Sequence, residues 1–148
     1  MLKIRGLNKN FGGLMAIKDL NFDLEKGQLL GVIGPNGAGK TTLLNLITGY
    51  LTPTSGVVSL ENQDITGLKP FEICHLGVAR TFQVVQPFTE MTVMENVVTG
   101  ALFSSKKSIS IEAARERCID PLRKVGLLGK QDQLAGALTL GEKKKLEL

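Results

Sequence analysis

The stretch Gly34-Pro35-Asn36-Gly37-Ala38-Gly39-Lys40-Thr41 decides how this chain is expected to fold. It follows an apolar run, residues 29–33, which predicts a buried strand, and it precedes residues 42–47, which predict a helix. Strand, glycine-rich loop and helix, in this order, form the context in which the pattern G-x-x-x-x-G-K-[ST] predicts a phosphate-binding loop. Gly49 is the expected stop of the helix, and its expected apolar face carries Leu43, Leu44 and Ile47.

The residue types in this stretch suit phosphate chemistry. Glycines allow backbone N–H groups to converge on phosphate oxygens, and the start of a helix adds N–H donors and a partial positive charge. Lys40 is predicted to reach the β- and γ-phosphates, and the Thr41 hydroxyl to hold Mg²⁺. The alternative is a glycine-rich surface turn before an ordinary helix.

The composition argues against several other classes of protein: nucleic-acid-binding, metal-binding or redox-active, and secreted or membrane-spanning. The chain has 148 residues, is 43 % hydrophobic and carries a net charge of +4, so it is long enough for one folded domain and only mildly basic. The densest basic run, Lys143 to Lys145, falls at an expected helix start. The sequence has no basic stretch with interleaved aromatic residues, the pattern that would predict nucleic-acid binding. Cys74 and Cys118 lack metal or redox spacing and are expected to be thiols. The absence of a signal peptide or long apolar run predicts a cytosolic location.

The front of the chain predicts an antiparallel β layer around the strand–loop–helix core. Residues 2–5 alternate as a short strand, and residues 10–13 read as a turn. Residues 19–25 predict a half-solvated strand antiparallel to the first. A turn at residues 52–56 leads into a further strand at 57–60.

The C-terminal half of the chain is expected to be predominantly helical. Residues 71–76 predict a short helix, and residues 78–82 a strand that enters a loop at Gln83. Thr92 is predicted to cap a helix, with Glu95 completing a capping box. Residues 104–110 predict a loop.

A second helix is expected after this loop. Pro121 either kinks it or restarts it, with Asp120 as the cap of the new helix, and Gly126 and Gly129 end it. Its apolar face is expected to carry Ile111, Ala114, Cys118, Leu122 and Val125.

Two further motifs follow the phosphate loop in order: Thr81-Phe82-Gln83, and Leu138-Thr139-Leu140-Gly141-Glu142 at the start of a new helical pattern. Together the three motifs resemble those of the nucleotide-binding subunit of an ATP-binding cassette (ABC) transporter. The resemblance implies an α/β fold, with a P-loop NTPase core, an antiparallel β subdomain and a partial helical subdomain. It implies an ATP-binding core with the β subdomain over residues 1–86, and a helical subdomain over residues 87–148.

The resemblance also implies roles for individual residues. Lys40 and Gln83 are the implied catalytic residues, and Thr41 and Gln83 the implied Mg²⁺ ligands. Phe11 is implied to stack on adenine, the alternative being a core or turn phenylalanine. The nucleotide-binding set is Phe11, Gly34, Pro35, Asn36, Gly37, Ala38, Gly39, Lys40, Thr41 and Thr42.

Thr139, Leu140, Gly141 and Glu142 are the implied signature residues, which cover the γ-phosphate held by the other subunit of a head-to-tail dimer. The usual family sequence is Leu-Ser-Gly-Gly-Gln, so Thr139 keeps the hydroxyl, while Leu140 and Glu142 depart from it. Glu142 is expected to place a negative charge near the partner's triphosphate, with Lys143 to Lys145 offsetting it. Glu142→Gln is therefore expected to tighten ATP-driven dimerisation in the full-length protein.

Beyond the signature, the family pattern continues to an apolar strand ending in Asp-Glu and to a switch histidine. Neither is present up to Leu148, and the one histidine, His75, is expected on a surface helix. Phosphoryl transfer requires a positioned water and neutralised charge. The chain is therefore expected to bind nucleotide without hydrolysing it alone, to be a fragment of a longer protein, and to lack several central strands.

Within the family, two stretches look most like the ATPase subunits of branched-chain amino-acid importers: residues 79–83, and Phe88 with residues 91–97. Residues 47–50 and 64–67 support this. The resemblance implies ATP and Mg²⁺ as cofactors, a homo- or heterodimer of ATP-binding subunits, and transmembrane permease subunits that dock after Gln83. It places the protein on the inner face of the cell membrane, with no nucleic-acid partner. The alternatives are an ABC ATPase for another solute, one acting on nucleic acid or ribosomes, and a non-hydrolysing regulatory module.

Overall fold

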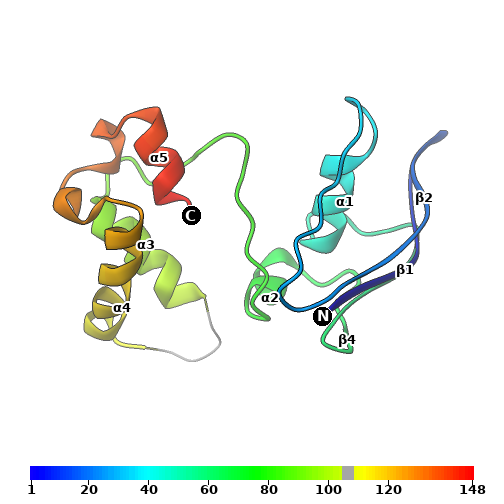
Figure 1. The fold of residues 1–148 in the computed structure, drawn as a ribbon, viewed down its shortest axis with the longest axis horizontal. Helices are drawn as coiled ribbons and strands as arrows, with labels where there is room; N and C mark the ends of the chain where they lie inside the picture. The colour runs from blue at the N-terminus through cyan, green and yellow to red at the C-terminus, as the bar shows by residue number, and fades with distance from the viewer. Residues whose placement is uncertain (105–108) are drawn as a thin grey trace. The chain divides into compact units, whose positions relative to one another are not determined.

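The computed structural model describes residues 1–104 and 109–148, which form two compact units, Met1–Cys74 and His75–Leu148 (Figure 1). Each unit has its own core. The division expected after residue 86 concerns functional domains and stays a prediction.

The first unit contains a four-stranded antiparallel sheet in the order β2-β1-β3-β4, which confirms the predicted β layer. The strands are β1 (Leu2–Phe11), β2 (Leu14–Leu24), β3 (Ser55–Leu60) and β4 (Gln63–Asp64). The first two are longer than predicted, because β1 pairs with a neighbour on each side and the turn between them shrinks to Gly12 and Gly13.

A bulge in β1 places two side chains three residues apart in the same core. Ile4 and Leu7 are both fully buried, although strict alternation would send them to opposite faces. The register with β2 shifts between these two residues, and Gly6 has a φ of 56°. A glycine in the left-handed region is the usual means of inserting an extra residue into a strand. Ile17 and Val58 from the neighbouring strands complete this part of the core.

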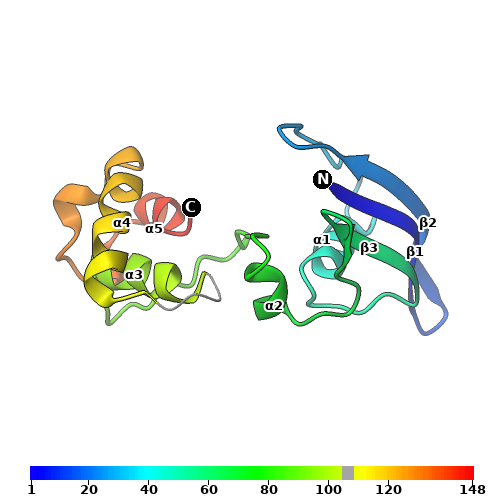
Figure 2. The same ribbon diagram turned by 90° about the horizontal axis from the view of Figure 1, so that it is seen from below.

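Helix α1 (Lys40–Ile47) follows the phosphate loop and lies beside the sheet of its own unit (Figure 2). Its buried residues are Leu43 and Leu46, and Ile47 is half-buried, so the prediction was correct for Leu43 and wrong for Leu44, which is 47 % exposed. Gly49 follows the helix with a φ of 77°, and an added Cβ there would lie 2.4 Å from the Leu68 carbonyl oxygen. The predicted stop at Gly49 is therefore confirmed.

The predicted strand before the loop is not formed. Residues 28–35 have no regular secondary structure, and the side chains of Leu29 and Ile33 are fully exposed. A strand requires a ladder partner, and the registers of the sheet within the described residues pair none of this segment. The apolar character of residues 29–33 therefore predicted burial, but the described residues supply no neighbour that covers them.

The middle of the chain differs in detail from the prediction. The short helix is confirmed as α2 (Pro70–Cys74), but His75 lies in the turn that follows it rather than on a helix. Residues 78–82 form no strand. The Phe82 N–H donates instead to a side-chain oxygen of Glu147, so a strand ladder does not satisfy this part of the backbone.

The second unit packs α3 (Val93–Phe103), α4 (Ile111–Lys124) and α5 (Leu140–Leu146), with short 3₁₀ turns at Leu128–Lys130 and Ala135–Ala137. The capping box of Thr92 and Glu95 at the start of α3 is confirmed. Helix α4 runs through Pro121 without a break, so the restart capped by Asp120 was wrong. The core of this unit contains Val93, Met94, Val98, Ala114, Cys118, Leu122, Leu127 and Leu138.

Two smaller expectations are also settled. Cys74 is an exposed free thiol and Cys118 a buried one, as predicted. Of the predicted loop at residues 104–110, Ser104 caps the end of α3 and Ser110 the start of α4, while residues 105–108 lie outside the described residues. Within the described part of the chain, the helices are too short or too polar to cross a membrane.

Candidate nucleotide-binding site

The phosphate loop turns through two left-handed glycines before α1. Gly37 and Gly39 have φ values of 85° and 83°, and between them the Ala38 N–H donates to the Pro35 carbonyl oxygen over 3.2 Å. The Leu43 N–H then donates to the Gly39 carbonyl oxygen over 2.8 Å and begins the helix. The loop therefore delivers the chain into the N-terminus of α1, where backbone N–H groups have no helical acceptor.

Gly39 also determines how closely the loop approaches β2. A Cβ added there would lie 2.6 Å from the Ala16 carbonyl oxygen, closer than any side chain tolerates. Its positive φ is a second reason for glycine, since other residues rarely adopt that region. Both constraints fix the final turn of the loop against the sheet of the same unit.

The Lys40 side chain folds back over the loop. Its Nζ donates to the carbonyl oxygens of Gly34 and Pro35, over 2.6 Å and 2.7 Å. The first turn of α1 contains no acidic residue. The ammonium group and the helix N-terminus therefore provide positive charge without a carboxylate on the same turn, which favours an anionic ligand.

The other predicted loop residues remain accessible. Thr41 at the start of α1 is exposed, and Thr42 beside it is half-buried. A hydroxyl oxygen at this position suits Mg²⁺, which accepts few protein ligands and takes the rest from phosphates and water. Of the remaining loop residues, Pro35, Asn36, Gly37 and Ala38 are exposed, and Gly34, Gly39 and Lys40 are half-buried.

Phe11 lies at the end of β1, next to the hairpin turn. Its side chain is 45 % exposed, so it is not a core phenylalanine. The Lys9 Nζ lies 5.1 Å from the centre of the ring. An open aromatic face with a cation beside it can stack on a purine and attract an anionic ligand.

The predicted site residues divide between the two units. Phe11 and residues 34–42 belong to the first unit, whereas Gln83 and residues 139–142 belong to the second. Gln83 is exposed in an irregular segment. After it, a cavity of about 170 Å³ is bordered by Val85, Gln86, Pro87, Phe88, Asn96, Lys143, Leu146 and Glu147.

The predicted signature residues, 139–142, form the start of α5. Thr139 is the N-cap, and its Oγ1 accepts a hydrogen bond from the Glu142 N–H over 3.3 Å. In return, the Glu142 carboxylate accepts from the N–H and the hydroxyl of Thr139, each over 3.0 Å. Thr139 and Glu142 thus form a capping box, as the N-cap and N3 residues of α5. The sequence had predicted a capping box only at Thr92 and Glu95.

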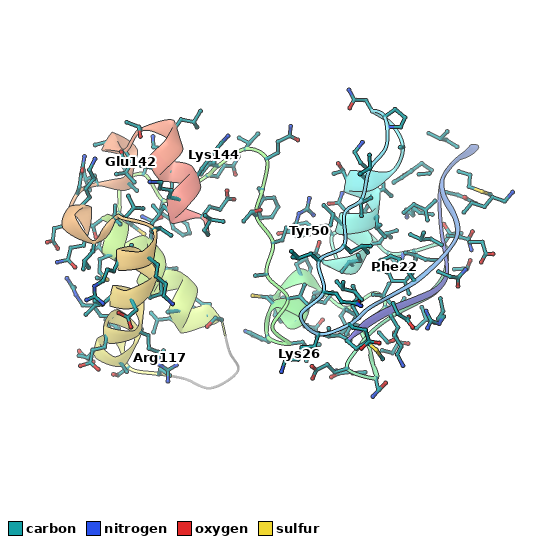
Figure 3. All side chains as sticks on the ribbon, in the orientation of Figure 1. Phe22, Lys26, Tyr50, Arg117, Glu142 and Lys144 are labelled. Atoms are coloured by element: carbon teal, nitrogen blue, oxygen red, sulfur yellow. The ribbon has the colours of Figure 1, made fainter. Side chains whose placement is uncertain are left out.

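Lys130 is a residue that sequence reasoning missed. Its Nζ lies 2.5 Å from Oε1 of Glu142, whose place at α5 is marked in Figure 3. This ion pair, with the hydrogen bonds from Thr139, lowers the pKa of Glu142 to about 2. The cation paired with Glu142 is therefore Lys130 rather than Lys143, whose Nζ donates to the Gly136 carbonyl oxygen over 2.9 Å. No spacing rule signals a pair between a 3₁₀ turn and a helix.

The phosphate loop, the helix that follows it and the antiparallel sheet define a P-loop nucleotide-binding domain of the ABC cassette type. The chain belongs to the ABC transporter family, whose sequence model matches residues 17–148.

Within this family, the chain is similar to ATP-binding proteins of branched-chain amino acid transport. The chain is 38 % identical to the high-affinity branched-chain amino acid transport ATP-binding protein LivG of Escherichia coli (strain K12), covering all of this chain and 63 % of that protein. It is 37 % identical to BraF of Pseudomonas aeruginosa, which has the same descriptive name, with the same coverage. It therefore spans about 63 % of the length of these relatives.

Solved structures agree with the fold. The ADP conformation of MJ1267, an ATP-binding cassette of an ABC transporter, is similar with a TM-score of 0.86 and 38 % identity, over 99 % of this chain and 62 % of that one. A nucleotide-free ATP-binding cassette from an ABC transporter is similar with a TM-score of 0.77 and 32 % identity, over 99 % of this chain and 64 % of that one.

Proposed function

We propose that this chain is the ATP-binding part of an ABC importer ATPase that drives uptake of branched-chain amino acids. The observation that carries the proposal is the phosphate loop, with Gly39 fixed against β2 and Lys40 folded over the loop. The names of LivG and BraF support the solute class. The solute itself is recognised elsewhere, since nothing in the loop chemistry reads an amino acid.

Each site residue has a role in this proposal. The ring of Phe11 stacks on adenine, residues 34–42 surround the phosphates, and the Thr41 hydroxyl is a ligand of Mg²⁺. Lys40 neutralises charge on the β- and γ-phosphates. Gln83 contacts the Mg²⁺ and reports the state of the nucleotide to the membrane subunits.

The predicted signature residues and a related structure support the proposed partners. Thr139 to Glu142 cover the nucleotide of a second ATP-binding subunit, in a homo- or heterodimer. The ABC transporter cassette MJ0796, similar with a TM-score of 0.84 and 25 % identity, has a dimeric structure. Permease subunits dock at the cavity after Gln83, which places the complete protein on the inner face of the membrane.

Hydrolysis requires more than these residues. The family's second acidic motif and switch histidine have no counterpart in the 148 residues. We therefore propose that this chain alone binds nucleotide without turning it over. Mg-ATP incubated with the chain should release no phosphate above the level of the Lys40→Ala variant, and phosphate release that depends on Lys40 would contradict this.

Calorimetric titration with Mg-ATP tests the binding site. The parent chain and Lys26→Ala, an exposed lysine in a turn, should bind saturably, whereas Lys40→Ala should not. Circular dichroism of all three proteins establishes that they are folded. A folded parent chain that binds no Mg-ATP would overturn the proposal.

Copurification from cells distinguishes the family-level alternatives. A longer protein that contains this chain should copurify with a transmembrane permease. Recovery with ribosomes or nucleic acid would instead favour the soluble class of ABC ATPase.

A further inference from the structure

The segment that carries Gln83 is held at Phe82 by the C-cap residue of α5 and at Phe88 by a side chain of α3. Residues 78–88 have no regular secondary structure, so their backbone N–H groups find acceptors elsewhere or face water. The Phe82 N–H donates to Oε1 of Glu147 over 3.0 Å, and the Phe88 N–H donates to Oδ1 of Asn96 over 2.8 Å. Gln83 is next to the first of these two attachments.

The attachment to α3 uses both ends of one amide. While Oδ1 of Asn96 accepts from Phe88, its Nδ2 donates to the carbonyl oxygens of Phe88 and Thr92, over 3.0 Å and 2.9 Å. The residue therefore joins the end of the segment to the capped start of α3. This end is fixed by several bonds.

The attachment to α5 is the hydrogen bond from Phe82 to Glu147, two residues that lie 65 positions apart in the sequence. Glu147 is the C-cap of α5, the helix that begins at the signature residue Thr139. Its carboxylate makes the bond charge-assisted and so stronger than one between neutral groups.

Two hollows adjoin this bond. Glu147 borders the cavity of about 170 Å³ described above and a second one of about 400 Å³. The second is lined by Thr81, Phe82, Gln83, Lys144, Lys145, Glu147 and Leu148. The Phe82 ring lies beside Arg80, whose guanidinium carbon is 5.0 Å from the ring centre, while the Glu147 carboxylate holds the backbone N–H of Phe82.

We propose that Glu147 is a positioning residue that ties the Gln83 segment to the signature helix α5. The bond keeps Gln83 and the start of α5 in a fixed relation within the second unit. A displacement of Gln83 is then transmitted along α5 to Thr139. This transmission rests on the proposed function, in which Gln83 contacts the bound nucleotide site. The attachment of Phe82 to Glu147 does not depend on the proposed function.

Amide hydrogen exchange in the nucleotide-free 148-residue chain tests the attachment. In Glu147→Ala, the Phe82 amide should exchange on the order of tenfold faster, since its acceptor is gone. Glu147→Gln keeps an acceptor oxygen and should retain most of the protection. The amides of Phe88 and Lys143 are controls, because they are bonded to Asn96 and to the Thr139 carbonyl oxygen.

Three results would overturn the attachment. Unchanged exchange of Phe82 in Glu147→Ala would show that the carboxylate does not hold it. Equal acceleration of all three amides would show a general loosening of the unit rather than a local bond. Acceleration in Glu147→Gln equal to that in Glu147→Ala would show that an acceptor at this position is not what matters.

Addition of Mg-ATP tests the transmission separately. In the parent chain and in Glu147→Gln, the amide signals of Gln83 and Lys143 should shift together, whereas in Glu147→Ala only Gln83 should shift. Shifts of both in Glu147→Ala would overturn the transmission. A parent chain that does not bind Mg-ATP would contradict the proposed function and, with it, the transmission, while Phe82 exchange would still decide the attachment.

Discussion

The Lys130 ammonium lies 2.5 Å from the Glu142 carboxylate, so the acidic residue in the signature is part of an ion pair at the start of α5. The same carboxylate accepts two hydrogen bonds from Thr139. Most Glu142 side-chain surface is covered, whereas Lys130 is more open to solvent. Glu142 thus contributes to the local structure of the helix start, in addition to any effect on a bound phosphate.

This pairing predicts a pH dependence of stability. The pKa of Glu142 in the folded chain is about 2, below its ordinary value of 4.5, so the folded state binds fewer protons than the unfolded state between these values. Its contribution to the free energy of unfolding is complete above about pH 4.5 and is lost as the pH falls towards 2. The melting temperature should therefore fall less on acidification in Glu142→Gln than in the parent chain.

Glu112→Gln is the matched control, since Glu112 is also an acidic first-turn residue, at the start of α4. It should keep the parent's dependence on pH. Thermal unfolding followed by circular dichroism at several pH values between about 6 and 3 gives both slopes. An undiminished slope in Glu142→Gln would contradict the prediction.

The same pair predicts an effect on dimerisation in a longer protein that contains this chain. In the proposed dimer, where Glu142 is near the partner's triphosphate, Lys130→Met would remove the cation and leave the Glu142 charge, so ATP-driven dimerisation should weaken several-fold. Glu142→Gln alone should tighten dimerisation, and the double variant should return towards the parent. Sedimentation with Mg-ATP measures all three.

Lys124→Met, in the last turn of α4, removes a lysine away from the signature and should leave dimerisation unchanged. Dimerisation of Lys130→Met equal to that of the parent would show that the pair does not control the charge at the helix start.

Substitution of two glycines in the phosphate loop by alanine should affect stability and Mg-ATP binding to different degrees. Gly37 and Gly39 both have positive φ, but only at Gly39 would a Cβ collide, with the Ala16 carbonyl oxygen at 2.6 Å. Gly37→Ala should therefore cost about 1 kcal/mol of stability through backbone strain. Gly39→Ala should cost more and abolish binding of Mg-ATP, because the loop must move away from β2.

Gly31→Ala is the control for these variants, since Gly31 has neither a positive φ nor a close neighbour. Urea denaturation and calorimetric titration measure stability and binding. If Gly39→Ala bound Mg-ATP as tightly as Gly37→Ala does, the close approach to β2 would not be needed for the site.

The sequence predicted features whose causes are local. Capping by Thr92 and Glu95 depends on residues three apart, and the glycine loop before α1 depends on its own backbone angles. The strand at residues 29–33 failed because a strand requires a neighbour that the described residues do not supply. Lys130 and Glu147 were missed because their partners are brought near by tertiary packing.

Replacement of Pro121 in helix α4 should stabilise the chain. Helix α4 runs from Ile111 to Lys124 with Pro121 in its interior, where proline has no N–H to donate to the preceding turn. Pro121→Ala restores that donor and removes the steric conflict of the ring, and the gain exceeds the extra entropy of the unfolded chain. The free energy of unfolding should rise by about 1–2 kcal/mol.

The exposed Glu116, on the same helix, supplies the control. Glu116→Ala makes the corresponding change to alanine where the backbone donor is already present, and it should change stability by less than about 0.5 kcal/mol. Urea denaturation of both variants and the parent gives the comparison. Stability of Pro121→Ala at or below that of the parent would mean that the ring of Pro121 contributes packing worth more than the missing hydrogen bond.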